Sequence, residues 1–205
     1  MIINDVNSIM RWKASRLPTG YREIPYLETT INVNYIDLGF TGYATIDAEI
    51  EVIDESTTAS QYLFGTRSTG SNSRFALYIQ QGNNYQCGLG GWVSTTISPA
   101  YQKVHYNFNP FLKTLEIGNE TASLGSGYTT YPPNRTLTLA MYNEANTIPT
   151  TYTQGISMKI YPDFVTYNSS NTETHRFVPC IRTADNKNGL YDLIGNSFKA
   201  LTNFS

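Results

Sequence analysis

The sequence carries little charge and few of the residues from which catalytic and metal sites are usually built. Only 15% of its 205 residues are Asp, Glu, Lys or Arg, and it contains two histidines and two cysteines. Nucleic-acid binding depends on Lys and Arg contacts to phosphates, so a formal net charge of −2 gives no basis for it. The sequence also has no run of about 20 apolar residues, and we therefore expect no membrane insertion.

Short catalytic motifs are missing as well. There is no GxSxG elbow, no HExxH and no glycine-rich phosphate loop, and His105 and His175 stand in no recognisable motif with Cys or Ser. Cys87 and Cys180 are far apart and form no CxxC pair, so we expect two buried free thiols, with a disulfide as the alternative. The start of the chain resembles no signal peptide, which predicts a soluble protein made in the cytoplasm.

What the sequence does contain is typical of β-structure. It has 13% aromatic residues, including 16 tyrosines, together with 15 glycines and many Thr and Asn. Aromatic and β-branched residues suit a pleated, half-buried surface, while Gly, Asn and Pro supply tight turns. All-β sandwiches often reach about 200 residues as one unit, so we expect a single domain.

Many short strands separated by turns are predicted along the chain. The clearest is 46–52, where apolar and acidic residues alternate with a period of two. This pattern predicts an all-β jelly-roll sandwich of two antiparallel sheets. The other predicted strands are 61–66, 75–80, 85–89, 103–108, 114–117, 136–142, 157–161 and 189–193, and the predicted turns are 68–73, 81–84, 118–120 and 131–134.

The N-terminal residues 1–16 form a separate segment before the domain, which we place at 17–205. Residues 4–13 are the best candidate for a helix, because apolar residues recur at three- and four-residue spacing after Asn4 or Asp5. A helix this short is marginal in water and needs a packing partner. We therefore expect an attachment element whose contacts are made by Val6, Ile9, Met10 and Trp12.

Both ends of the domain resemble a known family. Near the N-terminus, residues 17–21 read LPTGY and 34–40 read NYIDLGF. Near the C-terminus, RFVPCIR at 176–182 is followed by GLYDL at 189–193. This order and spacing is similar to concanavalin A-like (laminin-G-like) lectin-fold domains of bacteriophage virion proteins and of prophages in gut bacteria. Residues 26–30 belong to the same opening pattern, and Asp185 and Phe198 belong to the closing one. Looser similarity covers 63–67 and 114–119. The chain departs from the family pattern at Thr29-Thr30 and at 186–188, which lengthens a turn.

The resemblance implies a non-catalytic virion protein. It suggests a capsid decoration or a head or tail fibre component that displays a lectin-like domain toward host or mucosal glycans. Its partners would then be other virion proteins, or further copies of the chain, bound through the N-terminal segment. A free or cell-associated carbohydrate-binding lectin is the alternative function, and fold alone does not decide between them.

Several residues of the C-terminal motif have simple structural explanations. Pro179 cannot donate a ladder hydrogen bond, so we expect it at a strand end or sheet edge. Phe177 and Cys180 are expected in the core, and Asp192 is expected to accept backbone hydrogen bonds where the strand turns. Residues 185–189 faintly resemble a calcium loop but lack its bidentate Glu. An Asx-rich hairpin turn is the simpler explanation, and we expect no cofactor, with calcium left open.

One strand offers a candidate for catalysis. Asp47, Glu49 and Glu51 alternate and therefore share one face. This resembles the ExDxE strand of some laminarinases and related glucanases of the same fold class, in which two carboxylates act as nucleophile and acid/base. The order of acids differs, however, and no Trp flanks the strand to bind a sugar. A glycan hydrolase is thus a third hypothesis, and we expect no enzyme activity.

A carbohydrate site is predicted instead from aromatic and amide content. Sugar sites combine an aromatic face with polar groups that bind hydroxyls. Asn83, Asn84, Tyr85, Trp92 and Tyr101 lie in one glycine-rich stretch that offers both. The alternative is that Tyr85 and Trp92 belong to the hydrophobic core.

Overall fold

The computed structural model describes residues 16–54, 59–68, 73–81, 83–125, 132–143 and 154–204. In these ranges every regular element is a β-strand. No helix that is long and apolar enough to cross a membrane occurs among the same residues. The predicted helix at 4–13 and the attachment residues Val6, Ile9, Met10 and Trp12 lie outside the described residues.

The strands are short and follow one another closely. The first nine in chain order are β1 (Tyr21–Glu23), β2 (Leu27–Thr29), β3 (Asn34–Thr41), β4 (Thr45–Asp54), β5 (Gln61–Arg67), β6 (Arg74–Ile79), β7 (Tyr85–Leu89), β8 (Gly91–Ser94) and β9 (Lys103–Asn109). They are followed by β10 (Thr114–Ile117), β11 (Glu120–Ser123), β12 (Thr136–Leu139), β13 (Ser157–Ile160), β14 (Phe164–Tyr167), β15 (Glu173–Arg182), β16 (Lys187–Asp192) and β17 (Ser197–Asn203).

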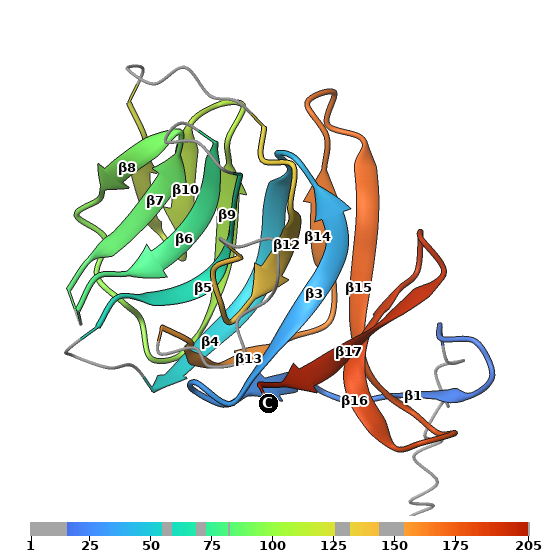
Figure 1. Ribbon diagram of the computed structural model, residues 1–205. Helices are drawn as coiled ribbons and strands as arrows, with labels where there is room; N and C mark the ends of the chain where they lie inside the picture. The colour runs from blue at the N-terminus through green and yellow to red at the C-terminus, as the bar shows by residue number, and fades with distance from the viewer. Residues whose placement is uncertain are drawn as a thin grey trace, which may run out of the picture.

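All pairings between these strands are antiparallel, and they form two layers (Figure 1). One layer has the order β8-β7-β6-β5-β12-β3-β17. The other runs β11-β10-β9-β4-β14-β15-β16-β17, with β13 and β2 continuing beside the second half of β4. Strand β17 pairs with β16 over its first half and with β3 over its second half, so it joins the two layers.

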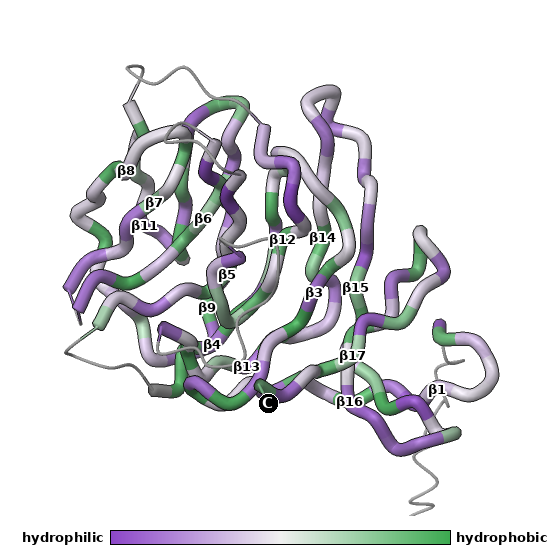
Figure 2. Tube along the Cα trace, viewed as in Figure 1, coloured by the Kyte–Doolittle hydropathy of each residue, from purple (hydrophilic) through white to green (hydrophobic). Residues whose placement is uncertain are grey.

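Aromatic side chains fill the space between the layers. The ring of Phe108 in β9 stacks on Phe75 of β6, with centroids 5.3 Å apart, and lies 5.6 Å from Phe64 of β5. All three side chains are fully buried. At the same level the hydroxyls of Tyr85 and Tyr106 lie 2.6 Å apart. Because side chains alternate along a strand, β4 contributes every second residue to this core, from Ile46 to Val52. Figure 2 shows the resulting mixture of apolar and polar residues along the strands.

The nine predicted strands agree with observed ones, with one clear error, whereas β1, β2, β3, β8, β11, β14, β15 and β17 were not predicted. Each of the nine predicted ranges overlaps an observed strand, and 85–89 and 114–117 agree in full. The predicted strand 136–142 is too long, because β12 ends at Leu139. Ala140 has a φ of 59°, in the left-handed region that residues with a Cβ rarely adopt, and this turns the chain out of the ladder.

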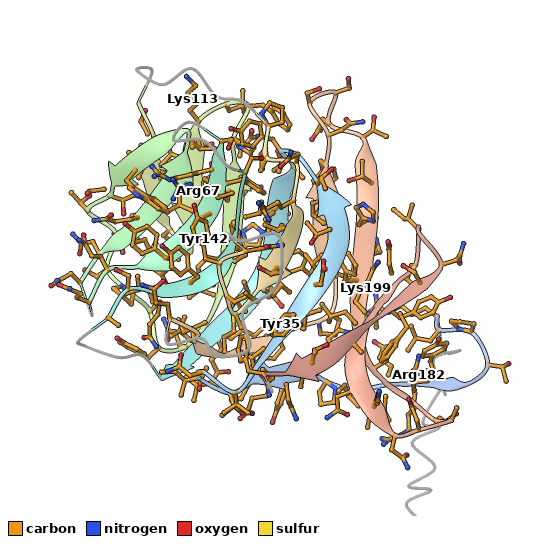
Figure 3. The ribbon with its side chains drawn as sticks, viewed as in Figure 1. Tyr35, Arg67, Lys113, Tyr142, Arg182 and Lys199 are labelled. Carbon is orange, nitrogen blue, oxygen red and sulfur yellow. The ribbon has the colours of Figure 1, made fainter. Side chains whose placement is uncertain are left out.

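The ends of β15, β16 and β17 project beyond the two layers together with β1, at the lower right of Figure 1. We call this part the C-terminal arm, and Figure 3 places Arg182 in it. It has its own small core of Leu17, Val178, Cys180 and Tyr191, with Tyr21, Leu193 and Phe198 packed against it. In β16 only Gly fits at position 189, because a Cβ there would collide with the carbonyl oxygen of Lys199.

The expected position of Pro179 at a strand end or edge is wrong. It lies inside β15, opposite Leu190 of β16. The Ile24 N–H donates to the Pro179 carbonyl at 3.0 Å. The nitrogen and the carbonyl of one strand residue point to the same side, so the proline nitrogen faces the β1 side as well. On this side of β15, Phe177 pairs with β14 and Cys180 pairs with β1, so Pro179 lies in the gap between the two partner strands. The missing N–H of proline is therefore tolerated.

The cysteines behave as predicted. Both are free and buried, Cys87 in the main core and Cys180 in the C-terminal arm. Burial raises the pKa of the Cys180 thiol to about 11, and it also raises the pKa of Cys87. Phe177 lies in the main core, as expected.

We predict that Phe108→Ala destabilises the protein by about 3–5 kcal/mol, because it leaves a cavity between the layers. Phe111→Ala is a matched control, since its ring is 40% exposed, and we expect a change within about 0.5 kcal/mol. Urea unfolding of both variants measures the difference. Equal losses in the two variants would show that the aromatic layer does not determine stability.

Candidate functional site

The three acidic residues of β4 share one face, as predicted, and each has a partner on a neighbouring strand. Asp47 lies 2.9 Å from Nε2 of His105, and its second oxygen accepts a hydrogen bond from Asn107. Glu49 pairs with Lys103 of β9. Glu51 pairs with Lys159 of β13, at 2.8 Å. This face of β4 is therefore a row of cross-strand polar pairs, in which Glu49 and Glu51 form ion pairs with lysines.

Glu51 is the least exposed of the paired glutamates. Its second oxygen accepts a hydrogen bond from the Tyr161 hydroxyl at 2.6 Å. The hydrogen bonds from Lys159 and Tyr161 hold the pKa of Glu51 below its usual 4.5, while the same contact raises the pKa of Tyr161 to about 12. A glycosidase acid needs a raised pKa, so the shift at Glu51 runs opposite to that requirement.

The five residues of the predicted carbohydrate site are not gathered in one place. Tyr85 is fully buried, with its hydroxyl against Tyr106, and has no surface atom with which to contact a ligand. Trp92 is half-buried on the opposite face of its sheet, where its ring packs against Tyr62 and Tyr78, and the Arg74 guanidinium lies 4.7 Å above it.

The same aromatic cluster includes Tyr142, which Figure 3 labels and which stacks on Tyr62 with centroids 4.6 Å apart. Tyr62, Tyr78 and Tyr142 are all buried. Trp92 therefore packs against a third hydrophobic cluster, separate from the main core and from the core of the C-terminal arm. This agrees with the alternative that Tyr85 and Trp92 are packing residues.

The remaining residues of that prediction lie at the surface. Asn83 and Asn84 form the turn between β6 and β7, and the Ser98 hydroxyl donates to Asn84 Oδ1 at 3.3 Å. Tyr101 is 54% exposed in the loop before β9. Ser98 belongs to this loop, so Asn84 lies beside the segment that carries Tyr101, while Trp92 packs elsewhere.

Asp192 has the structural role that its position predicts. It is 1% exposed, and its Oδ1 accepts hydrogen bonds from the backbone N–H groups of Arg176 and Ile194. Its Oδ2 lies 2.6 Å from Nδ1 of His175. The His175 ring makes stacked contacts with Phe40 and with Phe177. These contacts fix the start of the turn after β16.

The turn at 183–186 is an Asx turn, which was the simpler of the two explanations for residues 185–189. Asp185 accepts a hydrogen bond from the backbone N–H of Lys187 and two more from the Arg182 guanidinium. Of residues 186–188, which we expected to lengthen this turn relative to the family pattern, Lys187 and Asn188 belong to β16. Only Asn186 is accommodated in the turn, with a φ of 56°. In the described ranges no group of three or more His, Cys, Asp or Glu side chains is arranged to hold a metal ion.

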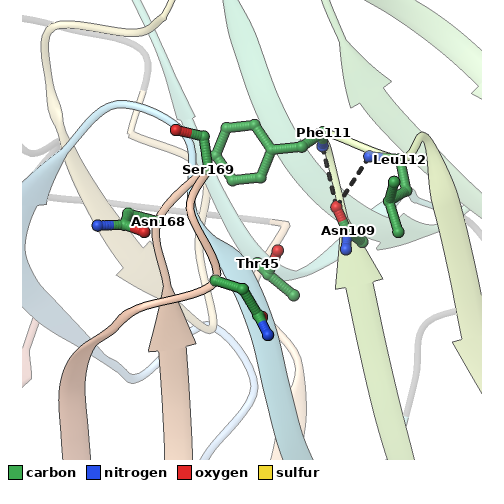
Figure 4. Close-up of a pocket in the computed structure, with 7 residues that line it drawn as sticks. Thr45, Asn109, Phe111, Leu112, Asn168 and Ser169 are labelled. Atoms are coloured by element: carbon green, nitrogen blue, oxygen red, sulfur yellow. Dashed lines mark hydrogen bonds between the residues drawn. The ribbon is translucent and has the colours of Figure 1, made fainter.

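A cleft of about 260 Å³ lies at the rim of the molecule, where β9 and β14 end and β4 begins (Figure 4). These ends meet because Thr45 of β4 pairs with Tyr167 of β14, while Ile46 pairs with Phe108 of β9. Exposed apolar side chains and amides line it together. The lining residues are Thr45, Asn109, Phe111, Leu112, Asn168, Ser169 and Asn171.

Two of the asparagines hold the loops around the cleft. Asn109 Oδ1 accepts hydrogen bonds from the N–H groups of Phe111 and Leu112, at 3.0 and 2.9 Å. Asn168 Oδ1 likewise accepts from Ser170 and Thr172, at 2.9 and 3.0 Å. With each carbonyl oxygen engaged, the NH₂ group is the remaining hydrogen-bonding group of both side chains. We call Asn109 and Asn168 the capping asparagines.

The cleft was not predicted from the sequence. An apolar Phe111-Leu112 pair directly after the turn-forming Asn109-Pro110 is the one local signal, because large apolar residues in a turn are exposed. Residues 168–171 lie more than 50 positions further on. Their proximity depends on β4 lying between β9 and β14, which local patterns do not specify.

Comparison with known proteins identifies no family for this chain: no family model matches it, and no curated protein matches it.

We predict that Glu51→Gln lowers the melting temperature at neutral pH more than Glu49→Gln does, because the side chain of Glu51 is 24% exposed and that of Glu49 is 48% exposed. The folded pKa of Glu51 is lowered, so its contribution to stability is complete above pH 4.5 and is lost as the pH falls through the folded pKa. The difference between wild type and Glu51→Gln should therefore shrink below pH 4.5. Thermal melts from pH 3 to pH 8 test this, and a constant difference would rule the ion pair out as its source.

Proposed function

We propose that this chain is a non-catalytic saccharide-binding protein of the concanavalin A-like jelly-roll type, carried on a bacteriophage particle. The observation that supports binding is the rim cleft, in which Phe111 and Leu112 lie beside three asparagine amides. Sugar rings present C–H groups on their faces and hydroxyls at their edges. An apolar wall next to amides matches both surfaces of such a ligand.

The contacts that hold the cleft residues also favour binding. The capping asparagines fix both loops before any ligand arrives, so less conformational entropy is lost on association. The cleft is small, and one site should bind weakly. Many copies on one particle would raise the overall affinity through avidity.

The family assignment rests on the resembling motifs and on where they lie in the fold. The N-terminal LPTGY segment leads into β1, which pairs with β15 at Tyr21 opposite Arg182. The NYIDLGF segment forms most of β3, which pairs with β17 at Ile36 opposite Leu201. In the β1–β15 pair the opening and closing segments that resemble the family are thus direct neighbours, which is consistent with a shared fold signature.

The absence of catalysis is supported by the acidic face of β4. Each of Asp47, Glu49 and Glu51 is engaged by a neighbouring side chain, and the pKa of Glu51 is shifted away from the value an acid catalyst needs. Reducing-sugar release from β-glucans that is abolished by the Glu49→Gln, Glu51→Gln double variant would overturn this part of the proposal.

The saccharide-binding proposal predicts glycan binding that depends on Phe111. We expect signal on a glycan array with multimerised protein, and Phe111→Ala should lose roughly 0.5–1.5 kcal/mol, or about 2- to 10-fold in Kd. Tyr101→Ala is the matched control, because Tyr101 is an exposed aromatic outside the cleft, and it also tests the site predicted from the sequence. Loss of binding in Tyr101→Ala alone would move the site to the loop before β9.

The virion proposal predicts that the N-terminal segment is needed for attachment. The described contacts begin at Arg16, which pairs with Glu23 and Asp163, and at Leu17, which packs into the C-terminal arm. Deleting residues 1–15 spares these contacts, so we expect an unchanged melting temperature but no incorporation into particles. Mass spectrometry of purified particles measures incorporation. If the full chain binds glycans but is absent from particles, a free or cell-associated lectin is the better explanation.

A further inference from the structure

We propose that the rim cleft selects neutral sugars over acidic ones, an inference that rests on the proposed saccharide-binding function. The lining consists of amides, hydroxyls and two large apolar side chains, and none of its residues is charged. A uronate, sialate or sulfate group would lose part of its hydration there without gaining a cationic partner. Five of the seven lining residues are exposed, so the charge would be only partly desolvated. Even partial desolvation of a charge without a cationic partner opposes binding.

The amide orientations add a second element of selectivity. The carbonyl oxygens of Asn109 and Asn168 are each used by two backbone N–H groups. What these side chains offer a ligand is therefore their NH₂ groups, and within the described residues neither NH₂ group has a protein acceptor. A donor-rich site requires acceptors, which neutral sugars supply through ring and hydroxyl oxygens.

Acidic sugars also carry acceptors, so the donors alone do not exclude them. The distinction between neutral and acidic sugars comes from the strength of the hydrogen bonds that replace the water around a carboxylate. A single amide N–H donor replaces that water less well than the bidentate Arg found in anion sites. In the described structure the Arg182 guanidinium is engaged by Asp185 in the C-terminal arm, and Arg176 is held by Glu173 and Asp163. Neither these cations nor Lys113, which follows Leu112 in the chain, lines the cleft.

The size of the cleft limits the ligand as well. About 260 Å³ is slightly below the usual range of small-molecule sites, which begins near 300 Å³. Such a cleft accommodates one sugar residue, with its apolar face toward Phe111. We therefore expect recognition of a single terminal or exposed residue of a longer glycan.

Matched sugar pairs test the selectivity directly. The full chain is titrated with the methyl glycosides of glucose and galactose, and with those of glucuronate and galacturonate, which differ from them by one carboxylate. Binding is followed by the NMR signals of the asparagine side-chain amides. At least one neutral sugar should shift the signals of Asn109, Asn168 or Asn171, and its acidic counterpart should bind at least about ten-fold more weakly.

Isosteric variants test the donor groups. In Asn109→Asp and Asn168→Asp the remaining carboxylate oxygens still accept the loop N–H groups, while the NH₂ donor is lost. We expect an unchanged melting temperature and roughly five-fold weaker binding of the neutral sugar. Asn84→Asp is the matched control, since Asn84 is a turn amide outside the cleft, and it should bind as the wild type does.

The outcomes separate this inference from the function on which it rests. Equal or tighter binding of the acidic sugars, or capping-asparagine variants that bind like wild type, would overturn the neutral selectivity while leaving saccharide binding intact. If no sugar of either kind shifts any signal of the folded chain, and the glycan array is also empty, the proposed function itself is wrong.

Discussion

The stacking of Phe75 against Phe108 between the two layers is the contact on which the rest of the structure depends. It joins β6 of one sheet to β9 of the other, and Phe64 extends it to β5. Because β9 is held from the core side, its partner β4 is fixed in register along six residue pairs. Strand β4 in turn positions β13 and β14. Both the acidic face and the rim cleft thus follow from the same packed strand.

The rim is ordered by a different kind of interaction. In the loops beyond the strand ends, backbone N–H groups have no partner in a neighbouring strand and need other acceptors. Asn109 and Asn168 supply them, each through one side-chain oxygen that binds two N–H groups. This use of the oxygen leaves Phe111 and Leu112 at the surface instead of folded inward. Satisfying the backbone of two turns therefore also creates an apolar wall next to amide donors.

The sequence was informative where local patterns determine structure and uninformative where distant segments meet. Alternation predicted β4, and the partners of Asp192 are the backbone groups that its place in a turn suggested. Trp92 shows the limit, because an aromatic residue in a glycine-rich stretch suits a sugar site or a packing cluster equally, and only the contacts with Tyr62 and Tyr78 distinguish them. To predict the cleft, one would need to know which strands lie beside β4. To place Pro179, one would need to know where the partner strand of β15 changes from β14 to β1.

The segments that resemble the lectin-like family and the segments that line the cleft are different parts of the chain. The resembling motifs contribute to β1, β2, β3, β5, β10 and β15 to β17. Several of these strands form the C-terminal arm and the junction between the layers. The cleft comes from Thr45 and the loops after β9 and β14, none of which carries a resembling motif. Residues that pair strands are constrained by the fold, whereas loop residues are free to differ as long as their backbone groups are satisfied. A scaffold divided in this way can keep its sheets while its rim loops change. The resemblance therefore bears only on the proposed family, and the proposed choice of a sugar ligand must rest on the chemistry of Asn109, Phe111 and Asn168.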